Sequence, residues 1–178
     1  MLNNVQEFLD DFKDYVIQQA KSNLTRMKKN SSKTLYNSLK GYVKESKNSI
    51  QISFEMEDYG FFQDQGVSGK KQKYDTPFSY KDKMPPPNKL DKWIVRKGIA
   101  PRGKGGKFKG RKINSVGFRK SIQFLIARSI YMNGIKPSLF FTKPFEAAFK
   151  KLPDELVEKY GLDVEELFEE ITKENFKK

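Results

Sequence analysis

Apolar side chains follow a helical spacing over the first 29 residues of the chain. They recur every three or four positions between residues 3 and 29, which predicts one long amphipathic helix that Asn30-Ser31-Ser32 ends. The stripe consists of Val5, Phe8, Leu9, Phe12, Tyr15, Val16, Ala20, Leu24 and Met27. A stripe of this kind is typical of a helix that packs against a core.

The pattern then changes to the alternation of a β-strand. Residues 35–43 and 50–56 place apolar and polar side chains in turn, which predicts an antiparallel hairpin that turns near residues 45–48. The first arm also fits a short helix capped by Ser32. Both alternatives stay open for this arm.

Three further helices are predicted in the middle of the chain, each ended by glycine. Residues 57–69 hold closely spaced aromatic side chains and predict a short helix that stops at Gly66. Residues 90–97 predict a second short helix, closed by Gly98, and residues 117–133 a longer one ended by an Asn-Gly pair. The apolar stripe of the longer helix is Phe118, Ile122, Leu125, Ile126, Ser129 and Ile130.

The C-terminal part is helical and acidic. Aromatic and proline residues from Pro137 on lead into a helix that runs through Phe149, and residues 153–176 predict one or two acidic helices. Their apolar face is Leu156, Val157, Tyr160, Leu162, Val164, Leu167, Phe168 and Ile171.

Two long loops interrupt these elements. Residues 66–88 have no period and contain three consecutive prolines from Pro85 on, and residues 99–116 are basic and rich in glycine. Loops of this length inside a compact domain are typical of binding arms or disordered segments.

The length and composition predict one soluble α+β domain with extensions. The 178 residues are 37% hydrophobic, which supplies a core, and 32% charged. The fold expected is a long N-terminal helix, a small antiparallel sheet, several packed helices, two long basic loops and an acidic helical C-terminal extension. We place the main domain at residues 1–150 and the extension at 151–178.

No apolar run reaches the ~20 residues that cross a bilayer, and the acidic N-terminus does not resemble a secretory signal, so we expect an intracellular protein.

Histidine and cysteine are absent from the chain. This excludes disulfides, thiolate zinc sites and every nucleophile that an imidazole activates. Adjacent carboxylates such as Asp10-Asp11 and Glu165-Glu166 point about 100° apart on a helix and form no shared acid/base or metal site. We therefore predict no catalytic residue, no metal ligand and no cofactor; an enzyme using carboxylates and Mg²⁺, such as a nuclease, is a distant alternative.

The net charge of +13 is spread unevenly along the sequence. Residues 66–112 carry fifteen Lys or Arg against three Asp, whereas residues 152–178 carry nine Asp or Glu against four Lys. A basic middle and an acidic tail predict a polyanionic partner for the first and a basic partner for the second, or pairing of the two between subunits.

The glycine-rich run at residues 98–112 resembles a phosphate-binding loop only in part. Its first eight residues match G-x-x-x-x-G-K-[ST] except that Gly105 replaces the hydroxyl that would hold Mg²⁺, and a helix precedes it where a buried strand is needed. A flexible cationic loop explains the run better.

The basic loops provide the candidate binding residues. These are Lys70, Lys71, Lys73, Arg102, Lys104, Lys107, Lys109, Arg111 and Lys112. Nucleic acid and an acidic protein surface are equally good partners for them, and simple solvation is the third possibility. Binding to phosphates alone would be non-specific and strongly dependent on salt. The aromatic groups near Tyr59 and Tyr80 fit base stacking, although core or interface packing is the more frequent use.

Several short motifs resemble those of tail-completion and neck proteins of tailed bacteriophages. They are Asp58-Tyr59-Gly60 through Gln65-Gly66-Val67, Lys92-Trp93-Ile94-Val95-Arg96-Lys97-Gly98-Ile99, Phe124 to Arg128 with Ser129-Ile130, Asn133-Gly134-Ile135-Lys136-Pro137, Phe140-Phe141 and Pro144-Phe145. In that family a Tyr-x-x-x-x-x-x-Gly segment follows the strands, and a Gly-Ile-x-x-x-x-Phe-Phe segment precedes a closing helix. The resemblance covers residues 1–150.

The resemblance implies a structural protein of the virion that is assembled in the host cytoplasm. Such proteins form rings that join the DNA-filled head to the tail, so the implied partners are further copies of the chain, portal or connector proteins and tail proteins, with double-stranded DNA as a further partner of the loops. The two basic loops and the acidic C-terminus have no counterpart in the family pattern. The alternative function is that of a non-specific nucleic-acid-binding accessory protein.

Overall fold

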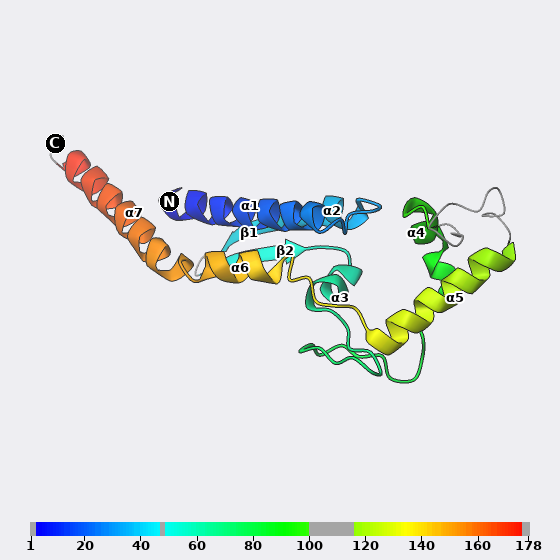
Figure 1. The fold of residues 1–178 in the computed structure, drawn as a ribbon. Coiled ribbons are helices and arrows are strands. Elements are labelled where there is room, and N and C mark those ends of the chain that lie inside the picture. Colours follow the sequence, from blue (N-terminus) through cyan, green and yellow to red (C-terminus); the bar gives the residue numbers. More distant parts are fainter. Residues whose placement is uncertain (1–2, 47–48, 100–115, 176–178) are drawn as a thin grey trace. The chain divides into compact units, whose positions relative to one another are not determined.

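The computed structural model describes residues 3–46, 49–99 and 116–175, with Val116 and residues 170–175 described by their backbone alone. The fold is α+β and mostly helical, as predicted (Figure 1). The chain forms two compact units: unit 1 is Met1–Glu57 with Leu139–Lys178, and unit 2 is Asp58–Ser138. The domain boundary expected after residue 150 stays a prediction.

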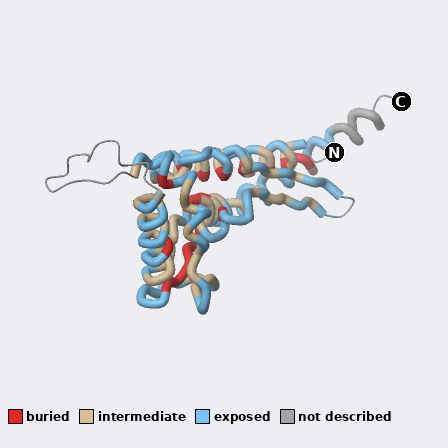
Figure 2. Tube along the Cα trace, turned by 90° about the vertical axis from the view of Figure 1, so that its right-hand side faces the viewer, coloured by how far each residue is buried: buried red, intermediate tan, exposed pale blue. Residues whose placement is uncertain are grey.

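Helix α1 (Asn3–Arg26) confirms the long N-terminal helix and ends three residues before the predicted end. Its buried residues are Val5, Leu9, Phe12, Val16, Ala20 and Leu24. These residues follow one side of the helix (Figure 2). Tyr15 was expected in the stripe but is exposed. The helix ends because Lys28 is left-handed, at φ 54°, so that the N–H groups of Lys28 and Lys29 donate to the carbonyls of Thr25 and Leu24.

Both alternatives for the next segment are partly right. A short helix, α2 (Thr34–Ser38), comes first, but its N-cap is Lys33, at φ 55° and without a side-chain cap, so the predicted cap by Ser32 is wrong even though Ser32 Oγ accepts the N–H of Thr34 at 3.4 Å. Strands β1 (Lys40–Ser46) and β2 (Ser49–Glu55) then form the antiparallel hairpin, in a register that pairs Lys40 with Glu55 and Ser46 with Ser49.

The core of unit 1 joins these elements to residues from the far end of the chain. It consists of Ala20, Leu24, Leu35, Leu39 and Phe140. Beside it, helix α6 (Thr142–Phe149) brings Phe145 within 6.1 Å of Phe12 and 5.9 Å of Phe54 between ring centroids, both in edge-to-face geometry. The predicted helix through Phe149 is thereby confirmed, and it closes the core over the hairpin.

The acidic segment forms one helix, α7 (Leu152–Asn175). Most of the large side chains on its predicted apolar face are exposed to solvent. These are Val157, Tyr160, Leu162, Leu167 and Phe168. The predicted acidic helix is therefore confirmed, and most of its apolar face is not covered by the described residues. Among the described residues of α7, it is a carboxylate, Asp163, that is buried, with 5% of its surface accessible.

Unit 2 contains α3 (Tyr59–Gln65), the 3-10 turn η1 (Pro87–Leu90), α4 (Asp91–Arg96) and α5 (Val116–Asn133). The glycines predicted to end α3, α4 and α5 have φ angles of 78°, 60° and 74°, which glycine adopts without steric cost. Arg119 donates to Asp91 at 2.6 Å and Gln123 donates to the same carboxylate at 2.7 Å, which fastens α4 to α5.

The buried side of α5 differs in part from the predicted stripe. Leu125 is 56% exposed and Ser129 is exposed, whereas the small side chain of Ala127 is fully buried. The predicted stripe included Ser129 and left out Ala127, because a helical period alone does not identify a small buried residue. In the part of the chain that the structure describes, no helix has the length and apolar character to cross a membrane.

Candidate interaction surfaces

The first basic loop is anchored at its start by a two-residue bridge. The N–H of Val67 donates to the carbonyl of Ile135 at 2.9 Å, and the N–H of Ile135 donates back to Val67 at 2.8 Å. This pairing brings Gly134 so close to the carbonyl oxygen of Val67 that a Cβ on Gly134 would collide with it. The loop therefore begins as a fixed part of unit 2.

The same loop covers the C-terminal end of α5. The N–H of Lys70 donates to the carbonyl of Tyr131 at 3.0 Å, and that of Lys71 donates to Met132 at 2.8 Å. Carbonyls in the last turn of a helix have no partner within the helix and carry partial negative charge, so amide donors and cations both stabilise this end. The Lys70 ammonium also lies 5.9 Å from the centre of the Tyr131 ring.

Further along, the loop closes on itself through its polar side chains. Ser68 Oγ accepts the N–H of Tyr74 at 3.0 Å and donates to the carbonyl of the same residue at 3.1 Å. Thr76 Oγ1 donates to the carbonyl of Gly66, and the N–H of Tyr80 donates to the carbonyl of Ser68. Residues 66–80 thus form a folded loop, and its interpretation as a binding arm stays a prediction.

Three of the nine predicted binding residues lie in this loop. Lys70, Lys71 and Lys73 are exposed and lie close together in the sequence, next to the end of α5. The other six, Arg102, Lys104, Lys107, Lys109, Arg111 and Lys112, lie outside the described residues, as does the glycine-rich run after Ile99. The structure thus locates one of the two predicted basic clusters.

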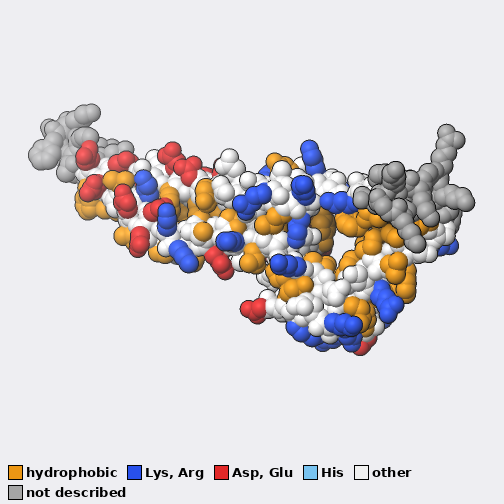
Figure 3. Space-filling view, in the orientation of Figure 1, with side chains coloured by type: hydrophobic (Ala, Val, Ile, Leu, Met, Phe, Trp, Pro, Cys, Tyr) orange, Lys and Arg blue, Asp and Glu red, His pale blue; other side chains and the backbone are white. Residues whose placement is uncertain are grey.

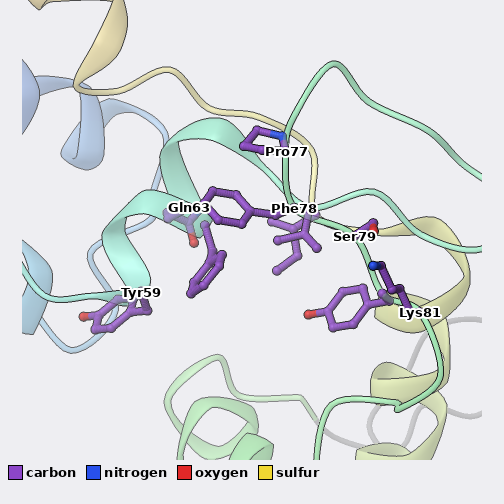
Figure 4. Close-up of a pocket in the computed structure, with 10 residues that line it drawn as sticks. Tyr59, Gln63, Pro77, Phe78, Ser79 and Lys81 are labelled. Atoms are coloured by element: carbon purple, nitrogen blue, oxygen red, sulfur yellow. The ribbon is translucent and has the colours of Figure 1, made fainter.

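An apolar groove of about 600 Å³ lies beside the loop in unit 2 (Figure 4). Tyr59 and Gln63 line it from α3, and Phe78, Tyr80 and Lys81 line it from the loop. The rings of Phe62 and Phe78 meet edge to face, with centroids 4.6 Å apart. Burial raises the pKa of the Tyr80 hydroxyl. The walls offer aromatic and aliphatic contacts with few polar groups, which suits an apolar side chain or a flat ring.

A second groove, of about 640 Å³, lies in unit 1. Val5 and Leu9 of α1, Ile50 and Ile52 of β2, and Leu156 of α7 contribute to its walls. Glu45 and Ser46 line it from the tip of the hairpin, and Val157 and Tyr160 line it from α7. The apolar face of α7 therefore continues into a hollow beside the hairpin.

Asp163 fixes α7 to the beginning of α1. Its carboxylate accepts the N–H groups of Asn4 and Val5 at 2.9 and 3.0 Å, and the Asn4 side-chain amide at 3.0 Å. Burial raises the pKa of this carboxyl, but the hydrogen bonds from Asn4 and Val5 lower it by more, so the pKa lies below its usual value of 3.8. The contact supplies a cap that α1 does not provide from its own sequence.

The net positive charge of the chain belongs to unit 2. The sequence of unit 2 has nineteen Lys or Arg against five Asp, whereas that of unit 1 has sixteen Lys or Arg against seventeen Asp or Glu. Within unit 1, acidic and apolar side chains lie together over α7 (Figure 3). The two units therefore present surfaces of different electrostatic character.

Sequence reasoning missed the exposed faces of α5 and α7, because helical periodicity shows that a face is apolar but does not show whether another element covers it.

The described residues contain no group of three or more acidic side chains placed to hold a metal ion. Comparison of the chain with protein-family models, with curated proteins and with solved structures finds no significant match.

Proposed function

We propose that the chain is a structural subunit that assembles into a ring at the head–tail junction of a tailed bacteriophage. The observation that carries the assembly role is the number of large apolar side chains exposed on both units, among them Val157 and Tyr160 in unit 1 and Phe61 and Leu125 in unit 2. Soluble monomers seldom expose large contiguous apolar patches, and such patches are typical of surfaces that another molecule covers.

The setting in the virion rests on the resemblance of the short motifs. Two of them, the segments that end at Val67 and begin at Asn133, are paired through Val67 and Ile135. This pairing supports the view that the motifs belong to one structural unit. The unlike charge of the two units supports a ring, because contacts between different surfaces of identical copies repeat head to tail and close when the rotation allows.

A non-enzymatic role is part of the proposal. The sequence has no histidine or cysteine, which removes the commonest general base and thiol chemistry. A subunit that assembles once needs interface area more than it needs catalytic groups. Activity that requires Mg²⁺ and is lost when one carboxylate is changed would overturn this part.

Electron microscopy tests the proposal at two levels. Concentrated full-length chain is expected to form closed rings in negative stain, and immunogold labelling of tailed particles that contain the chain is expected at the junction of head and tail. Open aggregates or single molecules would contradict the ring. Label elsewhere on the particle would contradict the placement.

The alternative is a non-specific nucleic-acid-binding protein, and the charge of unit 2 favours it. Exposed Lys70, Lys71 and Lys73 lie in the same loop as the aromatic groove, a combination that single-stranded nucleic acids use. Tight binding to DNA that weakens steeply between low and physiological salt would favour this alternative over the ring.

A further inference from the structure

Helix α7 carries an apolar stripe bordered by carboxylates. Val157, Tyr160 and Leu167 lie at positions i, i+3 and i+10, on one side of the helix, and Val157 and Tyr160 are 73% and 54% exposed. Asp154, Glu158 and Glu165 form a row along one edge of this stripe and are exposed. None of the three forms an ion pair with another residue that the structure describes. We call this the acidic face of α7.

Helix α5 carries the opposite combination. Phe124 and Leu125 are both exposed, about 100° apart around the helix, and the exposed cations Lys120 and Arg128 lie four residues before and after Phe124 on its side of the helix. The side that α5 buries is different, since it holds Ala127 and Arg119, which is bonded to Asp91. We call the exposed side the basic face of α5.

The two faces match in length and in charge. At 1.5 Å per residue, Lys120 and Arg128 are separated by about 12 Å along α5, and Glu158 and Glu165 by about 10 Å along α7. Helices pack at interaxial distances of 8–10 Å when apolar ridges fill grooves, which places flanking cations and carboxylates within reach of each other. Packing α5 on α7 would cover both apolar stripes and pair both cations.

Resting on the assembly role proposed above, we infer that the acidic face of α7 in one copy binds the basic face of α5 in the next copy. A second copy fits better than nucleic acid, because phosphates would meet carboxylates on α7 and apolar Phe124 and Leu125 on α5. The contact joins two different faces, so it is head to tail and each copy keeps one face of each kind available. Unlike charges at its border also set its orientation.

Cross-linking between copies tests the contact directly, since the chain has no cysteine of its own. One variant carries Leu125→Cys and the other Leu167→Cys. The two are prepared with different masses, so that the mixed disulfide can be distinguished from the symmetric ones, and are then mixed and oxidised. We expect a mixed disulfide in at least about tenfold excess over that formed when Leu125→Cys is mixed with Ser22→Cys, which changes an exposed residue of α1. Equal yields would overturn the inference. A chain carrying both Leu125→Cys and Leu167→Cys that closes its disulfide without forming a dimer would also overturn it.

Charge reversal separates this inference from the proposed function. Glu158→Lys with Glu165→Lys, or Lys120→Glu with Arg128→Glu, should weaken self-association at least about tenfold, because like charges then face each other. Mixing the two double variants should restore association, while Glu55→Lys on β2 should leave it unchanged. Rings that form regardless of these changes would overturn the inference and leave the proposed function standing. Wild-type chain that never associates would overturn both.

Discussion

Asp163 on α7 accepts the backbone N–H of Val5 at 3.0 Å, across 158 residues of sequence. The same carboxylate accepts the N–H of Asn4, so one side chain satisfies two of the amides that the first turn of α1 leaves without a helical partner. Its negative charge lies at the positive end of the α1 dipole. The two ends of unit 1 are thereby joined at a single buried group.

Replacing Asp163 should destabilise unit 1. Asp163→Ala removes both backbone hydrogen bonds and leaves partly buried amides unpaired, which should lower the free energy of unfolding by about 2 kcal/mol. Urea denaturation followed by circular dichroism at low protein concentration measures the loss. Glu155→Ala, which removes an exposed carboxylate from the same helix, should change it by less than about 0.5 kcal/mol. Equal effects of the two changes would show that Asp163 does not cap α1.

The stabilisation by Asp163 should depend on pH. Because the pKa of Asp163 is lower in the folded chain than in the unfolded chain, its contribution is complete above the usual value of 3.8 and is lost as the pH falls through the folded value. The difference in unfolding free energy between wild type and Asp163→Ala should therefore be constant above about pH 5 and shrink toward pH 2. A difference that grows on acidification would contradict the assignment.

Gly134 should tolerate no side chain. Gly134→Ala places a Cβ against the carbonyl of Val67 at a φ of 74°, and should destabilise unit 2 by more than about 2 kcal/mol. Thermal unfolding measures this change. Gly161→Ala is the matched control, because its Cβ meets open space within α7, and it should stabilise the chain by about 0.5–1 kcal/mol. An unchanged melting temperature for Gly134→Ala would show that Val67 and Ile135 are not paired as described.

Removing the described lysines of the basic loop should affect binding more than folding. The triple change Lys70→Gln, Lys71→Gln and Lys73→Gln keeps the backbone hydrogen bonds to α5. It removes positive charge near the C-terminal end of that helix, and this loss should lower the melting temperature by only a few degrees. If the loop binds DNA, the slope of log K against log salt should flatten by about one for each lysine that contacts a phosphate. An unchanged slope would assign the loop to a protein partner or to solvent.

The boundaries of most elements could be predicted from local chemistry. Gly66, Gly98 and Gly134 end their helices because each adopts a positive φ, a property that sequence alone signals. The 3.6-residue period of α1 was likewise sufficient to identify all six of its buried positions, since each of them belongs to the predicted stripe.

What sequence did not reveal are relationships between distant segments. Asp163 appeared as one acidic residue among nine in the C-terminal segment, and nothing local marks it as the cap of α1. The apolar stripes of α5 and α7 could be predicted, but not that Leu125 and Val157 within them are exposed. Periodicity reports which side of a helix is apolar, whereas burial depends on what the rest of the chain, or another chain, places against it.

The mass of the full-length chain in solution, measured by light scattering from micromolar to near-millimolar concentration, tests the assembly role most directly. We predict a concentration-dependent rise from one 20.7 kDa copy to a defined multiple at which growth stops, as ring closure requires. A mass that stays at a single copy throughout this range would contradict it.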